Sequence, residues 1–375
     1  VPRGPARTPG HLNRFRRGRR RPTDRDASLI SLRRFGSLLL ALFLLGAARV
    51  HAGVADAPPE DLEVSLITYG PGDVYWERFG HDAIELRDRA SGEAVTFNYG
   101  LFDFDESGFL LNFARGRMRY LMGADSSTED QSYYIDSGRS VSRQRLAFSP
   151  EQAAALRAFL AWNLRPEHRR YDYDYYVSNC ATRVRDALDQ ALGGAIKRTL
   201  TTEPGGQTYR QQTARLMSNQ AWLMLILDLG LGPYADQPLN AWQESFLPMV
   251  LQEQLRKVRL DGDRPLVNQE TLVAPNRLNP PPALPPDLRW PLAAAGLAFA
   301  AALLLAARYA PLLYAVLGSL YLLLAGIAGL LMIVLWAFTL HRSAWANANL
   351  LFFNPLAWLL LPAVWRARHT AGSSS

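Results

Sequence analysis

The sequence predicts an α+β domain built on an antiparallel sheet, followed by an α-helical transmembrane domain. Two observations lead to this fold class. Short strand-like runs separated by turn residues dominate the region before residue 149, and helix-forming segments follow them. From Leu288 onward, long uncharged apolar runs appear. We expect a leader over residues 1–52, a globular domain over 53–286, a membrane domain of three helices over 287–366 and a tail over 367–375.

The leader carries most of the positive charge. Residues 1–52 contain 12 arginines and two acids, whereas the rest of the chain has 29 basic and 32 acidic residues, a net charge of −3. The overall net charge of +7 therefore does not indicate a nucleic-acid partner. Two arginines precede the apolar run Phe35–Ala48, and Val50 and Ala52 are small residues at the positions that a signal peptidase reads. This pattern predicts a secretory signal that is cleaved after Ala52, with an uncleaved anchor as the alternative.

The globular domain begins with strands and turns. Tyr69-Gly70-Pro71-Gly72 marks a turn, and Ser91-Gly92 is a hairpin signal. Ser149-Pro150-Glu151-Gln152 combines a capping serine, a proline at the first helical position and a capping-box glutamine, which predicts a helix to Leu164. The other expected elements are a helix at Glu106–Ala114 and strands at Val64–Thr68, Asp82–Arg87, Ala94–Tyr99, Gly116–Met122 and Ser140–Phe148.

Helices are also expected later in the domain. Asn219–Leu229 and Ala241–Arg256 have amphipathic helical patterns, and Arg259–Val273 is typical of a short polar hairpin. The proline-rich segment Asn279–Pro286 is expected to be a linker that ends the globular part.

Three apolar runs predict membrane spans: Trp290–Ala307, Leu312–Phe338 and Leu350–Trp365. Arginines in the turn after the first run and beyond the third run favour a cytoplasmic location for both sites, which leaves the globular domain outside the cytoplasm. The polar segment Thr339–Asn349 would then return to the outer side, close to the outer leaflet. It contains His341.

Cys180 is the only cysteine of the chain and lies in the segment Tyr171–Asp189. Asn179 is a suitable helix N-cap, so the thiol is expected in the first turn of a helix. Unpaired N–H groups there favour a thiolate with a lowered pKa and can hold a developing oxyanion. The alternative is a buried cysteine that acts as a small hydrophobic residue.

A thiol nucleophile needs a base within hydrogen-bond reach, and His81 is the best candidate. It follows Gly80 at the start of a strand-like run, where a side chain projects from the end of a sheet. Asn98 on the neighbouring strand is the preferred orienting group, with Tyr99 and Asp82 as alternatives. A structural histidine remains the other interpretation of His81.

Metal-ligand and cofactor motifs are not found in the sequence, so neither a metal nor a cofactor is expected. Arg183 follows Cys180 by one helical turn. A salt bridge is its ordinary role, although it could meet a phosphate.

Several stretches resemble one family. TYGPGDVYWERFGHDAIEL, VTFNYGLFDF and YYVSNCATRVRD resemble the periplasmic domain of the Lnb-type lipoprotein N-acyltransferases, and HRSAWANANLLFFNPL resembles that family's membrane portion. The resemblance implies a papain-like, NlpC-type thiol domain in permuted order, with the histidine before the cysteine, on the periplasmic side of a bacterial inner membrane.

The resemblance also implies an activity. In that family the cysteine takes an acyl chain from a phospholipid as a thioester and passes it to the N-terminal amine of a lipoprotein. Cys180 would then be the nucleophile and His81 the base. The residues themselves, and not the resemblance, make Asn98 the preferred third catalytic residue. Asn179, Arg183, Tyr99 and His341 are candidate binding residues. An NlpC-type peptidase or amidase acting on cell-wall peptide, a thiol lipid hydrolase and a non-catalytic binding protein are the alternatives.

Overall fold

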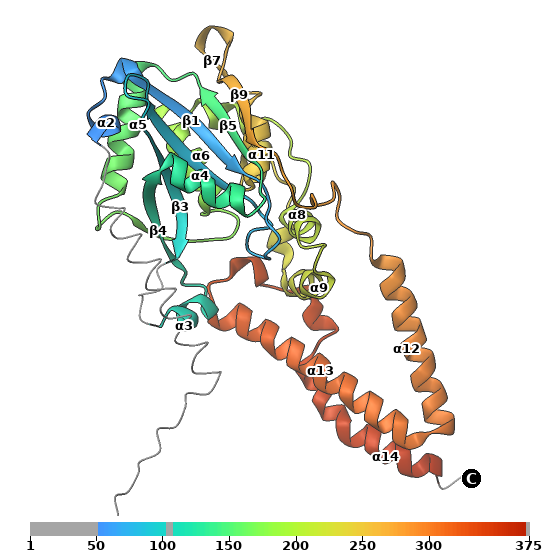
Figure 1. The fold of residues 1–375 in the computed structure, drawn as a ribbon. Helices are drawn as coiled ribbons and strands as arrows, with labels where there is room; N and C mark the ends of the chain where they lie inside the picture. Colours follow the sequence, from blue (N-terminus) through green and yellow to red (C-terminus); the bar gives the residue numbers. More distant parts are fainter. Residues whose placement is uncertain (1–51, 103–107, 373–375) are drawn as a thin grey trace, which may run out of the picture. The chain divides into compact units, whose positions relative to one another are not determined.

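The computed structural model describes residues 52–102 and 108–372. The predicted signal sequence therefore lies outside the described residues, as does most of the proposed leader. The described chain consists of an α+β region with a seven-stranded sheet, followed by three apolar helical segments (Figure 1). This confirms the fold class expected from the sequence.

All neighbouring strands of the large sheet run antiparallel, in the order β6-β4-β3-β2-β1-β5-β9. The central pair β1 and β2 aligns Leu66 with Ile84 and Tyr69 with His81. The strands are β1 (Leu62–Tyr69), β2 (His81–Asp88), β3 (Ala94–Phe102), β4 (Arg119–Ser126), β5 (Val141–Leu146), β6 (Arg170–Asp172) and β9 (Val267–Ala274). β7 (Arg259–Leu260) and β8 (Arg264–Pro265) form a separate small hairpin.

The main core lies between one face of the sheet and the helices α5 (Pro150–Asn163) and α6 (Cys180–Ala191). Leu66 and Ile84 of the sheet share this buried cluster with Leu156 of α5 and Leu188 of α6. On the other face, α4 (Ser127–Asp136) covers a smaller cluster that includes Tyr69 and Ala83. The sheet is therefore held between α4 and the α5–α6 pair, and the N-terminal end of α6 comes to lie near the start of β2.

The helices after α6 are α7 (Ala195–Leu200), α8 (Tyr209–Leu216), α9 (Ala221–Gly230), α10 (Ala241–Glu244) and α11 (Pro248–Leu255). Two sequence predictions were wrong here. The single helix expected at Ala241–Arg256 is divided into α10 and α11, because Pro248 begins a new helix. The polar hairpin expected at Arg259–Val273 exists only as β7 and β8, and β9 instead extends the main sheet beside β5.

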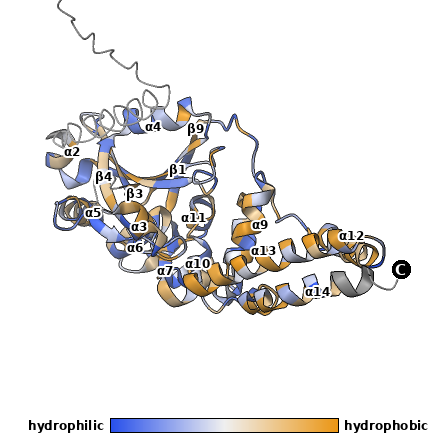
Figure 2. Ribbon diagram, turned by 90° about the horizontal axis from the view of Figure 1, so that it is seen from below, coloured by the Kyte–Doolittle hydropathy of each residue, from blue (hydrophilic) through white to orange (hydrophobic). Residues whose placement is uncertain are grey.

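Among the described residues, three segments are long and apolar enough to cross a membrane. They are α12 (Arg289–Tyr309), α13 (Pro311–Phe338) and Ala348–Ala367, as the sequence predicted. The third is irregular: the short 3₁₀ helices η5 (Ala348–Leu351) and η6 (Pro355–Leu360) precede α14 (Leu361–Gly372). Figure 2 shows α12 and α13 largely in the hydrophobic colour, as expected of helices that face lipid.

The segment between the second and third spans, Thr339–Asn349, is bonded to the globular domain, and we call it the outer loop. The Leu340 N–H donates to the Arg115 carbonyl at 2.8 Å, directly after α3 (Phe109–Ala114). The Gly232 N–H donates to the Ser343 carbonyl at 2.7 Å, and the Asn347 side chain donates to the Leu229 carbonyl of α9 at 2.8 Å. These bonds place the outer loop on the same side of the membrane as the globular domain.

Candidate active site

Helix α6 begins at Cys180 because Asn179 caps it. Asn179 Oδ1 accepts a hydrogen bond from the Thr182 N–H at 2.9 Å, and the Thr182 hydroxyl accepts one from the Asn179 N–H at 2.8 Å. The amide nitrogen of Asn179 donates to the carbonyls of Tyr175 and Phe246, each at 2.9 Å. Both ends of this side chain are thus engaged in the fold, so Asn179 positions the thiol.

The Cys180 thiol lies against the peptide that joins His81 to Asp82. The backbone N–H groups of Asp82, and of Cys180 and Ala181 at the start of α6, lie close enough to the sulfur to favour its thiolate form. Gly100 of β3 faces the cysteine, since a Cβ at this glycine would lie 3.7 Å from the Cys180 Cβ. Cys180 as a whole residue is partly exposed, whereas its sulfur lies in buried surroundings.

The surroundings of the thiol keep it neutral. The pKa of Cys180 is raised to about 12, first by burial and next by the charge of Asp82, whereas the three backbone N–H groups lower it by less. The expectation that the helix start lowers the pKa of this thiol was therefore wrong. The cost of burying a thiolate exceeds the stabilisation that the amides supply.

His81 begins β2, directly after Gly80. Gly80 has φ +78°, and a Cβ there would lie 2.9 Å from the Tyr69 carbonyl oxygen and 2.7 Å from Met249 Sδ, so only glycine fits. His81 Nε2 bonds Asn98 Oδ1 at 2.9 Å. Because this oxygen only accepts, Nε2 carries the proton in the neutral ring, and Nδ1 is left as the basic nitrogen.

A buried carboxylate fixes the orientation of Asn98. The Asn98 amide nitrogen donates to Asp130 Oδ1 at 3.0 Å, and the Tyr69 hydroxyl donates to the other oxygen of Asp130. The pKa of Asp130 is raised to about 6, first by burial, while the hydrogen bond from Tyr69 lowers it. Donation to Asp130 determines which end of the Asn98 amide faces His81, so Oδ1 is the atom available to Nε2.

The imidazole of His81 is packed among aromatic rings. Its ring stacks against Tyr69 and Tyr134 with both centroid distances at 5.9 Å. Burial lowers the pKa of His81 to about 4, the hydrogen bond to Asn98 opposes this shift, and the charge of Arg139 lowers the pKa further. At neutral pH the ring is therefore uncharged and able to accept a proton.

The two alternative orienting groups have other partners. Asp82 Oδ1 accepts a hydrogen bond from the Thr68 hydroxyl at 2.7 Å, and burial raises the pKa of this carboxyl to about 8. The Tyr99 hydroxyl donates to Asn163 Oδ1 of α5 at 2.8 Å. Of the three groups considered from the sequence, Asn98 is the one hydrogen-bonded to His81.

Comparison with family models shows to which protein family this chain is related. Residues 51–218 match the Lnb N-terminal periplasmic domain, and residues 290–373 match the Lnb transmembrane domain, so that together the matches cover about two thirds of the chain. The chain belongs to the Lnb family. Searches of curated proteins and of solved structures each returned no match. Lnb membership indicates a lipoprotein-modifying enzyme of the inner membrane whose main domain is periplasmic.

Arg183 of this Lnb-family chain stacks on an aromatic ring and makes no salt bridge at the thiol. Its guanidinium carbon lies 4.5 Å from the centre of the Tyr171 ring. The Tyr171 hydroxyl is buried and has no hydrogen-bond partner within the described residues. Both this hydroxyl and Cys180 lie next to Gly100. A Cβ added to Gly100 would be 3.9 Å from the Tyr171 hydroxyl and 3.7 Å from the Cys180 Cβ. Arg183 therefore supports a hydroxyl that lies close to the nucleophile.

His341 packs on a tyrosine of the segment that precedes Cys180. Its Nε2 is 3.2 Å from the Phe113 carbonyl, and its ring stacks on Tyr175 at 6.0 Å. Tyr175 in turn contacts Tyr173, whose pKa is raised by burial and then by the charge of Cys180. The outer loop thus contacts the segment that leads to the cysteine.

Helix α4 supplies residues of the site that the sequence did not reveal. Asp130 and Tyr134 lie on this helix, which was not predicted because its segment is polar and has no clear apolar face. The available signal was Ser126-Ser127-Thr128 followed by Glu129 and Asp130, a pattern of capping residues and first-turn acids that is typical of a helix start.

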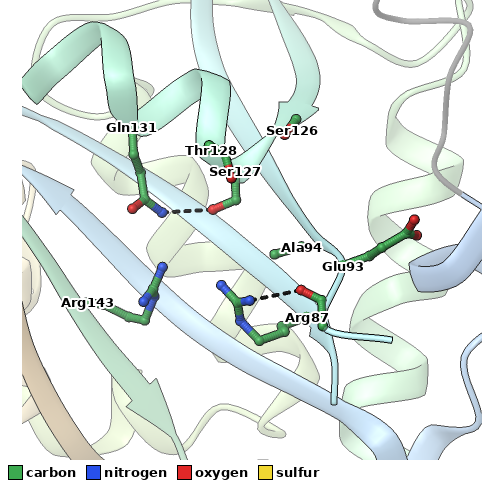
Figure 3. A pocket seen from close by; sticks show the side chains of 9 residues that line it. Arg87, Glu93, Ala94, Ser126, Ser127, Thr128, Gln131 and Arg143 are labelled. Atoms are coloured by element: carbon green, nitrogen blue, oxygen red, sulfur yellow. Dashed lines mark hydrogen bonds between the residues drawn. The ribbon is translucent and has the colours of Figure 1, made fainter. Parts of the chain in front are cut away.

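A pocket of about 260 Å³ near the N-terminal end of α4 is separate from the thiol (Figure 3). Arg87 and Arg143 line it, and both pair with the buried Glu85, at 3.4 Å and 3.0 Å. In Figure 3 Gln131 donates to Ser127 across its upper side. Both of its cations therefore share the carboxylate of Glu85, and the pocket does not contain the candidate catalytic residues.

Proposed function

We propose that this chain is a cysteine-dependent acyltransferase. It would move an acyl chain from a glycerolipid ester in the outer leaflet, through a thioester on Cys180, to the N-terminal amine of a lipoprotein. The observation that supports this proposal is that the thiol at the start of α6 lies against the peptide between His81 and Asp82, while the His81 side chain begins the hydrogen-bonded series His81–Asn98–Asp130. Membership of the Lnb family supports the lipoprotein and membrane lipid as substrates.

In the first half-reaction, the Cys180 sulfur attacks the ester carbonyl while His81 Nδ1 takes the thiol proton. A neutral thiol and a neutral imidazole start the reaction, so proton transfer accompanies the attack. When the tetrahedral intermediate collapses, the C–O bond of the ester breaks and the imidazolium returns its proton to the departing alkoxide. The products are a thioester on Cys180 and a lysolipid.

The oxyanion of that intermediate has candidate donors at the start of α6. The N–H groups of Cys180 and Ala181 lie close to the sulfur, whereas the Thr182 N–H is already bonded to Asn179. The buried Tyr171 hydroxyl, unpaired within the described part of the chain, is a third donor. A buried hydroxyl without a partner is destabilising, and a substrate oxygen would remove that cost.

In the second half-reaction, the amine of the acceptor attacks the thioester. The carbon–sulfur bond breaks, His81 takes the proton of the attacking nitrogen, and that proton returns to the sulfur. The products are an amide and free Cys180. Water competes for the thioester, so the burial that raises the pKa of Cys180 and lowers that of His81 also favours transfer over hydrolysis.

The test is the intact mass of the full chain after incubation with donor lipid in vesicles. We expect an added acyl group on the native chain and none on the Cys180→Ala variant. Two donors are compared: a phospholipid, and a lipopeptide whose N-terminal cysteine carries a diacylglyceryl group. The acceptor peptide should discharge the adduct and gain one acyl amide.

Three outcomes would contradict the proposal. If free fatty acid is released at the same rate in the presence and in the absence of the acceptor peptide, the chain is a lipid hydrolase. Cleavage of a cell-wall peptide without any lipid adduct would favour the peptidase, and inertness towards every donor would leave only a binding role.

A further inference from the structure

A second pocket lies where α3 meets the outer end of α13. Its volume is about 290 Å³, and it is lined by Arg115, Arg117 and the stretch from Ala337 to Leu340. The contact that forms it is tight: the Leu340 N–H donates to the Arg115 carbonyl, and a Cβ on Gly116 would lie 2.9 Å from the His341 nitrogen. The pocket is thus walled by the periplasmic domain on one side and a membrane span on the other.

Two arginines line this pocket. Arg115 and Arg117 are exposed, and neither makes an ion pair with any residue that the structure describes. By contrast, the nearby Arg119 pairs with Asp172 at 3.8 Å. A planar guanidinium binds phosphate oxygens through two parallel hydrogen bonds, so a pair of unpaired arginines in one pocket is suited to a phosphodiester.

Large apolar side chains surround the two arginines. On α3, Leu110 is 80% exposed and Leu111 54%, and Phe338 at the end of α13 is 74% exposed. Exposed apolar side chains beside cations match a lipid, whose headgroup is charged and whose chains are not. A soluble phosphate compound has no apolar chains that could pack against these side chains.

The pocket also lies at the level of the lipid headgroups. The 28 residues of α13 make a helix about 42 Å long, close to the thickness of a bilayer that includes both headgroup layers. Its C-terminal end is bonded to the periplasmic domain through the outer loop, so this end is the outer one. Phe338 and the two arginines are then at the outer headgroup layer.

We propose that this pocket binds a glycerophospholipid of the outer leaflet. Arg115 and Arg117 would hold its phosphodiester, and its acyl chains would lie against α3 and α13. The binding is independent of catalysis, but a role in supplying or orienting the acyl donor rests on the proposed function.

The pocket is connected to the thiol by aromatic contacts. The Tyr173 N–H donates to the carbonyl of Met118, the residue after Arg117, at 2.8 Å. Tyr173 stacks on Tyr120 at 4.1 Å, and Tyr120 contacts Phe102 at 4.8 Å. Phe102 in turn contacts Phe109 of α3 at 6.2 Å. A continuous series of aromatic contacts therefore joins α3 to the rings beside Cys180.

The test measures lipid retention by the full chain in detergent, by native mass spectrometry. The Cys180→Ala background is used so that no bound lipid is consumed, which separates binding from catalysis. The probes are phosphatidylglycerol, diacylglycerol with the same chains, and inorganic phosphate. We expect the phospholipid to bind at least about tenfold more tightly than diacylglycerol, a modest share of what two charge-assisted contacts provide.

The double variant Arg115→Gln/Arg117→Gln should lose this preference, and the matched control Arg119→Gln should keep it. Equal retention of diacylglycerol and phospholipid by the unaltered pocket would overturn the proposal, and this comparison remains valid even if the double variant folds poorly. Equal loss in the Arg119→Gln control would overturn it as well. If inorganic phosphate at a comparable concentration displaces the phospholipid, the pocket is a site for a free anion instead.

Discussion

The electrostatics of His81 predict a flat pH profile for formation of the acyl-enzyme. With its pKa lowered to about 4, about one His81 ring in ten carries a proton at about pH 5, and the fraction is negligible at about pH 8. A histidine with the ordinary pKa of about 6.5 would be about 97% protonated at the lower pH, so its rate as a base would fall about thirtyfold. We expect the observed rate to fall by less than about twofold across this range.

The assay is a single turnover in vesicles of zwitterionic donor lipid, quenched at intervals and read as intact mass. Two carboxyl groups complicate the result, because the pKa of Asp130 at about 6 lies inside the range and the pKa of Asp82 at about 8 lies at its upper end. The Asp130→Asn variant is therefore measured in parallel. A step in the rate near pH 6 that disappears in this variant belongs to Asp130. If the rate of the variant still falls by more than about tenfold towards low pH, the inference that His81 is an uncharged base is wrong.

Four further predictions follow from the site and from the membrane topology. His81→Ala should slow acylation at least about a hundredfold while the protein's abundance stays normal; a collapse in abundance would mean a structural histidine. Tyr171→Phe should lower the acylation rate by about a hundredfold with an unchanged or raised melting temperature, and an unaltered rate would exclude this hydroxyl from the oxyanion site. Gly116→Ala, which adds a Cβ at φ +75° against the outer loop, should reduce transfer from vesicles more than it reduces labelling of Cys180 by a soluble thiol reagent. Reporter fusions should place Asp287 in the periplasm and Arg366 in the cytoplasm, and the reverse pattern would contradict the topology.

Local signals predicted much of the fold. Turn residues and alternation located the central strands, and the capping box at Ser149 and the N-cap at Asn179 located α5 and α6, because these patterns act over a few residues. The break before Pro248 was missed because the apolar periodicity continues across it. The pairing of β9 with β5 joins segments far apart in the chain, and no local pattern encodes such a contact.

The candidate site could be predicted only where its chemistry is visible in residue types. The lone cysteine, the histidine after a glycine and the asparagine of the next strand are such residues, and the structure brings His81 and Asn98 into direct contact. The ionisation of Cys180 was predicted in the wrong direction, because a helix start can be recognised in sequence whereas burial cannot. Asp130 was missed for the same reason, since its role depends on how α4 packs on the sheet.

The hydrogen bonds of the outer loop have a consequence for which acceptors the thiol can reach. The loop is bonded to α9 as well as to the turn after α3, and Trp222 and Ile226 of α9 are 65% and 58% exposed. A domain attached at two places is restrained against rotation on its linker, which would keep Cys180 near one height above the leaflet. Substrates then meet it by lateral diffusion in two dimensions, at a high local concentration for molecules anchored in the same leaflet. Amines at a lipid anchor lie within this layer, whereas lysines on the folded body of the same lipoprotein lie above it. Selection of the N-terminal amine would thus follow from height alone, without recognition of the peptide that comes after it.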